Sequence, residues 1–239
     1  MSIFSNLNTE NMQEQKDVLG GGYTPLESGI YPAKIKSIYI TTSKRNAMAA
    51  NVIADIDGKE YREQLWITNS EGKPYYISKQ SGEKIALPGY TVLNDICLCT
   101  TGKELKEIDA EPRTFKIYDM EAKKELPKEV PTIIELQDAV VDLGIIHEIV
   151  DKTVKNANGA YVPSGETREQ NVIAKVFHSG THKTVNEARE GKTEAEFYNK
   201  WLEKNKGVTR NRAKGKSADA GTAGAPQKPA AAATKPLFS

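Results

Sequence analysis

One short segment of the chain alternates a guanidinium, a carboxamide and an indole, in Arg62, Gln64 and Trp66. The run from 61 to 68 has the period of two that is typical of a β-strand, so these three side chains would share one face. The other face would carry Tyr61, Glu63, Leu65 and Ile67. A face of this kind suits the stacking of bases beside a phosphate backbone better than it suits a hydrophobic core. The segment therefore predicts a surface that binds single-stranded nucleic acid.

The tryptophan and tyrosine side chains also have a purely structural interpretation. Tryptophans in strands are usually buried, and a shift of one residue in the expected register would place Trp66 in the core. For Tyr31, Tyr39 and Tyr61 we favour core positions. Trp201 is expected to dock a late helix on the body of the protein.

Basic residues in the neighbouring segments would neutralise phosphates. Lys34 and Lys36 share a face of the preceding strand, and Lys44-Arg45 lies in the loop that follows it. A basic pair in a loop is often only a solvated turn, but the lysines on the same strand favour a phosphate track whose affinity falls with salt. Lys73 and the pair Tyr75-Tyr76 lie in the next loop, where at most one tyrosine would face a ligand. The predicted nucleic-acid-binding residues are Trp66, Arg62, Gln64, Lys34, Lys36, Lys44, Arg45, Lys73, Tyr75 and Tyr76.

These side chains need a sheet to position them. Three strands are expected at 30–42, 50–56 and 60–68, and Asp57-Gly58 between the last two favours a type I′ hairpin turn. Pro88 and Gly102 bracket a helix expected at 90–101, with Cys97 and Cys99 as buried apolar residues. A second hairpin would pair 143–154 with 172–177 through a long polar tip at 155–168. Three strands, a helix and a hairpin follow the order of the five-stranded OB barrel, so we expect a mainly β protein of OB-fold type.

Shifts in composition divide the chain into four parts. The expected division is a flexible N-terminal arm at 1–22, the OB-fold domain at 23–180 with insertions at 69–89 and 103–136, a helical segment at 181–207, and a disordered basic tail at 208–239. The insertion at 69–89 would form a small hairpin, and Phe115, Ile117 and Tyr118 suggest an extra strand in the other insertion. The tail holds six basic residues and one acid, whereas the other 207 residues hold 27 basic and 31 acidic residues.

Length and composition exclude some classes of protein. No apolar run approaches the roughly 20 residues that span a bilayer, and no secretory signal is recognisable, so no membrane partner is expected. Two cysteines in 239 residues are too few for a disulfide scaffold and fit a reducing cytoplasm.

Several segments together resemble bacteriophage single-stranded DNA-binding proteins of the OB-fold type. The resemblance is carried by residues 20–32, 63–69 (EQLWITN), Pro88-Gly89 and 197–202 (FYNKWL). It implies a non-catalytic protein in the cytoplasm of an infected bacterium, which coats transient single strands during replication, recombination and repair. Many such proteins recruit replication or recombination proteins through an acidic tail with a terminal aromatic residue. Here Phe238 is next to last but the tail is basic, which places its role in recruitment in doubt and suggests DNA contact instead.

Other chemistry is less well supported. His178 and His182 with Cys97 and Cys99 total four zinc-type ligands, but the C-x-C spacing is unusual, and we expect no metal and no cofactor. Phosphate-binding loops and G-x-S-x-G elbows are missing, and acid pairs such as Asp55/Asp57 or Glu166/Glu169 are typical of solvated turns, so no enzyme is expected. A nuclease built from scattered acids, a virion or scaffold domain that binds other proteins, and a strand-annealing recombination mediator remain alternatives.

Overall fold

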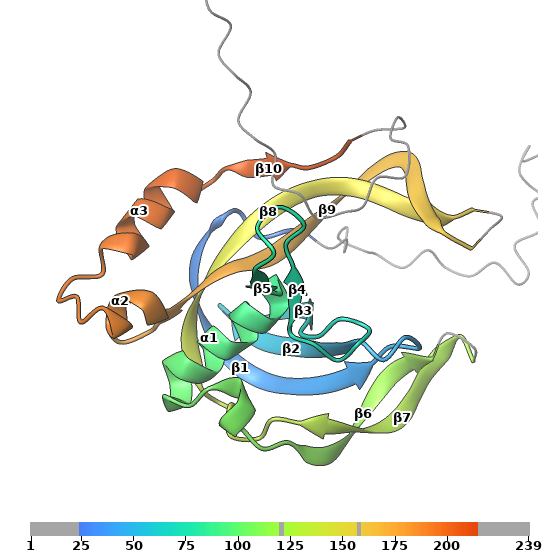
Figure 1. The fold of residues 1–239 in the computed structure, drawn as a ribbon, viewed down its shortest axis with the longest axis horizontal. Coiled ribbons are helices and arrows are strands. Elements are labelled where there is room, and N and C mark those ends of the chain that lie inside the picture. Colours follow the sequence, from blue (N-terminus) through green and yellow to red (C-terminus); the bar gives the residue numbers. More distant parts are fainter. Residues whose placement is uncertain (1–23, 120–121, 157–158, 215–239) are drawn as a thin grey trace, which may run out of the picture.

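A large antiparallel sheet forms the body of the computed structural model, which describes residues 24–119, 122–156 and 159–214. The expected N-terminal arm at 1–22 and the tail from 215 onwards lie outside these residues. Five strands follow each other in the sheet in the order β3-β2-β1-β8-β9 (Figure 1). Their bounds are β1 Gly29–Thr42, β2 Met48–Ile56, β3 Lys59–Trp66, β8 Val140–Lys155 and β9 Tyr161–His178. The expected mainly β class is confirmed, with the three expected N-terminal strands and the later hairpin.

A β-bulge divides β1 into two halves. Ile35 is opposite Ala54 and Ser37 is opposite Ile53, so Lys36 is an extra residue on this strand. Because one inserted residue reverses the alternation of faces, Ile38 becomes fully buried and Tyr39 turns away from the core. The expectation that Tyr39 is a core residue is therefore wrong.

Helix α1, Pro88–Thr101, lies between β3 and β8 in the chain and contacts β3, β8 and β9. Proline in its first turn and Gly102, which ends it in the left-handed conformation at φ 73°, are the expected start and stop. Leu93, Ile96 and Cys97 of the helix are fully buried in the main core. The predicted helix is confirmed. Cys97 is buried as expected, whereas Cys99 is only half-buried at the edge of the core.

A hydrogen bond from the backbone of β9 to the side chain of Glu63 connects β9 to β3. The Glu63 carboxylate accepts hydrogen bonds from the Ile173 backbone N–H at 2.7 Å and from the Tyr61 hydroxyl at 2.6 Å. Burial raises the pKa of Glu63 to about 6, although both hydrogen bonds act in the opposite direction. A half-buried carboxylate thus joins the two outer strands of the five-stranded order.

Both insertions form hairpins. The first contains β4, Tyr75–Ile77, and β5, Lys84–Ala86, as a separate two-stranded sheet. The second begins after η1, Leu105–Glu107, and consists of β6, Glu111–Asp119, and β7, Lys124–Thr132, which joins the main sheet where Thr132 pairs with Tyr39. The small hairpin and the extra strand expected from the sequence are both confirmed.

The β8–β9 hairpin is longer than expected, because its strands run on to Lys155 and Tyr161. The segment 155–168, predicted as a long polar tip, is mostly strand. In Figure 1 this hairpin and the β6–β7 hairpin both project to the right of the main sheet.

The C-terminal elements follow β9 in the chain and pack against different parts of the body. They are α2, Val185–Arg189, α3, Glu196–Asn205, and β10, Thr209–Asn211. Trp201 is 9% exposed and packs with Ile146 and Phe177 in a second core, which confirms its predicted docking role.

The start of the predicted disordered tail belongs to the sheet. β10 pairs in parallel with β8, and Arg210 lies 3.2 Å from the carboxylate of Glu148, which is 1% exposed. Arg212 approaches the same carboxylate at 3.6 Å. A buried carboxylate needs cationic partners, so these two arginines are structural, and the predicted tail boundary at 208 is too early.

Candidate nucleic-acid interface

On the face of β1, β2 and β3 that points away from the main core, side chains form rows that run across the three strands. Direct cross-strand pairs bring Trp66, Ala49 and Thr41 into one row, and Gln64, Asn51 and Tyr39 into the next. Two further rows follow, one of Arg62, Ile53 and Ser37 and one of Glu60, Asp55 and Lys34. We call this surface the outer face.

Trp66 is exposed on the outer face. Its side chain is 47% exposed, whereas its neighbours Leu65 and Ile67 are 5% and 6% exposed and point into the core. The faces assigned to β3 from its alternation are therefore correct, and the alternative of a core tryptophan is excluded. The exposed indole lies on the same face as the exposed side chains of Arg62 and Gln64, where a base could stack on it.

The backbone beneath Trp66 is fixed by the start of α1. A Cβ atom at Gly89 would lie 2.4 Å from the Trp66 carbonyl oxygen and 2.8 Å from its amide nitrogen. Only glycine allows helix and strand to approach so closely. The Pro88-Gly89 pair thus both starts the helix and positions the exposed indole.

A line of side-chain amides crosses the three strands next to Trp66. Gln64 donates to the Asn51 side-chain oxygen at 3.1 Å, and Asn51 donates to the Thr41 hydroxyl at 2.9 Å. These bonds link the side chains of all three strands next to the exposed indole. Asn51 was missing from the predicted residues, because a single polar residue in an apolar strand gives no separate signal.

Tyr39 brings a second aromatic group to the outer face. Its ring stacks on Phe115 of β6, with centroids 4.6 Å apart and an interplanar angle of 22°. Both rings are partly exposed. Neither was predicted for the site, because the bulge that turns Tyr39 outward and the pairing of β7 with β1 are not visible in the sequence.

The predicted basic residues separate into two groups. Lys44 and Arg45 are exposed in the β1–β2 turn, which adjoins the row that contains Trp66. Lys34 and Lys36 lie near Asp55, which is six residues from Ala49 along β2, or about 20 Å from the Trp66 row. The structure therefore brings only the turn residues close to Trp66.

Acids lie beside Lys34, Lys36 and Arg62. Lys34 lies 2.8 Å from Asp138, Lys36 lies 3.0 Å from Asp55, and Arg62 lies 2.6 Å from Glu60. The hydrogen bond to Asp138 raises the pKa of Lys34, and the hydrogen bond from Lys36 lowers the pKa of Asp55. Exposed ion pairs contribute only about 0–1 kcal/mol, so phosphates can replace the acids, but the acids also repel a polyanion.

The β4–β5 hairpin carries the remaining predicted residues. Lys73 lies 2.6 Å from Glu71 in its own turn, and the Lys84 ammonium lies 4.9 Å from the Tyr75 ring centroid. Tyr76 is 41% exposed. Tyr61 is 7% exposed and belongs to the core, as expected from the sequence.

The residues considered for a metal site have other roles. Burial raises the pKa of Cys97 and of Cys99 to about 12, so both remain thiols. The His182 ring lies 2.7 Å from the Asp142 carboxylate, and His178 accepts a hydrogen bond from the Thr181 backbone N–H. Within 24–119, 122–156 and 159–214, groups of three or more potential metal ligands do not occur.

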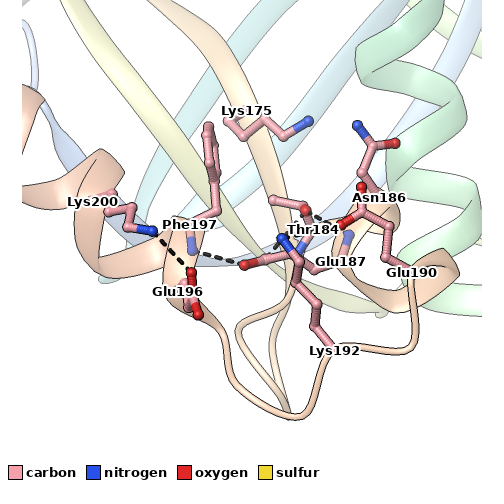
Figure 2. Close-up of a pocket in the computed structure, with 9 residues that line it drawn as sticks. All are labelled: Lys175, Thr184, Asn186, Glu187, Glu190, Lys192, Glu196, Phe197 and Lys200. Atoms are coloured by element: carbon pink, nitrogen blue, oxygen red, sulfur yellow. Dashed lines mark hydrogen bonds and ion pairs between the residues drawn. The ribbon is translucent and has the colours of Figure 1, made fainter.

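A cavity of about 230 Å³ lies between α2 and α3 (Figure 2). The Glu187 carboxylate accepts hydrogen bonds from the backbone N–H groups of Thr184 and Phe197, and Lys200 pairs with Glu196 (Figure 2). Burial raises the pKa of Glu187, but these hydrogen bonds outweigh it and the net pKa is lowered. The buried carboxylate thus connects the two helices. Neither this cavity nor the larger hollow of about 750 Å³ beside α1 is lined by a predicted binding residue.

Comparisons of the chain with protein-family models, with curated proteins and with solved structures gave no match. Among the residues that the structure describes, no helix is long and apolar enough to cross a membrane.

Proposed function

We propose that this protein binds single-stranded DNA without catalysis, with Trp66 as the central stacking platform. The observation that carries this proposal is the 47% exposure of the Trp66 side chain, which lies on the sheet beside the hydrogen-bonded amides of Gln64 and Asn51. Each base stacked on an aromatic ring contributes about 1–3 kcal/mol and every base has a π-face, so binding would tolerate any sequence. Lys44 and Arg45 at the adjoining turn would contact phosphates.

We also propose that the sheet is a barrel of the OB type. The order β3-β2-β1-β8-β9, with α1 between β3 and β8, is that expected for an OB-type barrel. In this interpretation Glu63 joins the seam between β3 and β9 through its hydrogen bond to Ile173. The outer face then corresponds to the strand surface that OB folds use for oligonucleotides.

The biological role that follows is coating of transient single strands during phage replication, recombination and repair. It is supported by the resemblance of the sequence to phage single-stranded DNA-binding proteins. A stacking site also accepts any base, as the coating of arbitrary sequences requires. Recruitment of partners through the tail concerns residues beyond 214, which lie outside the described part of the chain.

The two tryptophans of the chain allow a direct test, because one is exposed and the other is buried. In Trp201→Phe the only indole is Trp66, and its fluorescence should be quenched by poly-dT and recover as salt is added. In Trp66→Phe the only indole is Trp201, and poly-dT should leave its fluorescence nearly unchanged.

Affinity provides the second readout. Trp66→Ala should bind labelled oligo-dT at least ~5-fold more weakly than wild type, as loss of one stacked base implies. Wild-type protein that binds no oligo-dT at low salt would contradict the proposal, and a protein-binding scaffold would then replace it.

A further inference from the structure

Given the single-strand binding proposed above, we propose that the β6–β7 hairpin is a second DNA-binding element and that Phe115 is its stacking residue. The hairpin is an insertion between α1 and β8, and none of its residues was predicted for the site. It would hold bases that lie beyond those at Trp66.

The hairpin continues the outer face. Tyr39 pairs directly with Thr132 of β7, and directly paired residues point to the same side of a sheet. Val130, Lys128 and Leu126 follow on that side of β7, opposite Arg113, Phe115 and Ile117 of β6. The stack of Phe115 on Tyr39 joins this side of the hairpin to the row that contains Gln64 and Asn51.

The distance between Trp66 and the Tyr39–Phe115 stack means that the two would contact different bases. Tyr39 is two strands across and two residues along from Trp66, which is more than about 10 Å. Neighbouring stacked bases of a duplex strand are 3.4 Å apart, so Trp66 and Phe115 cannot serve adjacent stacked bases. A strand that touches both would cross the sheet over Gln64 and Asn51.

The two sides of the hairpin differ in charge. The Phe115 side carries Arg113, Lys124 and Lys128 against Glu111 and Asp119, which is three cations and two acids. The opposite side carries Lys116 against Glu125 and Glu129, which is one cation and two acids. Arg113 and Lys128 form exposed ion pairs with Glu111 and Asp119, which phosphates can replace. The side that continues the outer face is therefore the one suited to a polyanion.

The opposite side offers a matched control for Phe115. Tyr118 is 55% exposed on the same strand, three residues further on, and points the other way. Phe115→Leu should weaken binding of an oligo-dT of about 16 nucleotides by ~5-fold or more, whereas Tyr118→Leu should leave it unchanged. Because Phe115→Leu also loosens the contact with Tyr39, a second pair is needed. Arg113→Gln with Lys128→Gln should weaken binding and reduce its salt dependence, and Lys116→Gln should do neither.

Cross-linking locates the contact directly. An oligo-dT with single 5-iodouracil substitutions, irradiated on the wild-type protein, should form adducts with Phe115 or Tyr39 from one position and with Trp66 from another. Wild-type affinity in Phe115→Leu, with Trp66→Ala impaired and adducts only at Trp66, would overturn the inference and leave the function intact. Failure of the wild-type protein to bind any oligo-dT would instead remove the proposed function itself.

Discussion

The two ends of the outer face both carry basic residues but suit different tasks. At one end the exposed indole of Trp66, the Tyr39–Phe115 stack and the turn with Lys44 and Arg45 lie together. At the other end Lys34 and Lys36 are held by Asp138 and Asp55. The comparison teaches that the number of lysines on a strand does not define a phosphate track. What separates the two ends is distance from the exposed indole, because Lys34 and Lys36 lie about 20 Å from the Trp66 row whereas the β1–β2 turn adjoins it.

The largest effect should come from a substitution at Gly89, which lies against the backbone of Trp66. In Gly89→Ala the new Cβ would lie 2.4 Å from the Trp66 carbonyl oxygen, so helix and strand must separate. We expect the free energy of unfolding, measured in urea, to fall by about 3 kcal/mol or more. Gly180→Ala is the control, because its Cβ would be 3.1 Å from only the His178 ring, which can rotate. Equal stability of the two variants would show that Gly89 is not a close contact.

Glu63 tests whether the fold and the binding surface can be separated. Its pKa of about 6 exceeds the ordinary value of 4.5, so the folded chain binds this proton more strongly than the unfolded chain. The free energy of unfolding should therefore fall as pH rises from about 4.5 to 6, by about 2 kcal/mol at most.

Glu63→Gln should lose this pH dependence in urea unfolding and keep wild-type affinity for oligo-dT. Glu60→Gln, a change on the exposed side of the same strand, should retain it. Parallel pH profiles of wild type and Glu63→Gln would argue against a raised pKa of Glu63 at this seam.

A smaller effect should distinguish the basic groups at the two ends. Lys44→Gln with Arg45→Gln should reduce the slope of log affinity against log salt by about 1.4, if each residue neutralises one phosphate of a single strand. Lys34→Gln with Lys36→Gln should change the slope by less than about 0.7. Titrations of oligo-dT at several salt concentrations measure both, and a larger change in the second variant would reverse the comparison.

Local patterns were sufficient to predict much of the sheet. The alternation in β3 assigned Trp66 to the exposed side, and proline and glycine marked both ends of α1. Such signals are local, because burial of one face imposes a period of two on a strand and caps define a helix.

Local patterns could not predict contacts between segments that are far apart in the sequence. The bulge at Lys36 reverses the faces of β1, so Tyr39 was predicted in the core although it stacks on Phe115. Arg210 was predicted in a disordered tail, because the sequence gives no sign that Glu148, 62 residues earlier, is buried and needs a cation. Contacts of this kind depend on which strands become neighbours, and that is decided by the whole fold.

The most direct test compares the two ends in one experiment. Fluorescence anisotropy of labelled oligo-dT would be measured with Trp66→Leu and with Lys34→Gln/Lys36→Gln under the same low-salt conditions. We predict a loss of affinity of at least ~5-fold for Trp66→Leu and of less than ~3-fold for the lysine variant. A greater loss in the lysine variant, with Trp66→Leu close to wild type, would contradict the assignment of the DNA-binding surface to the Trp66 end.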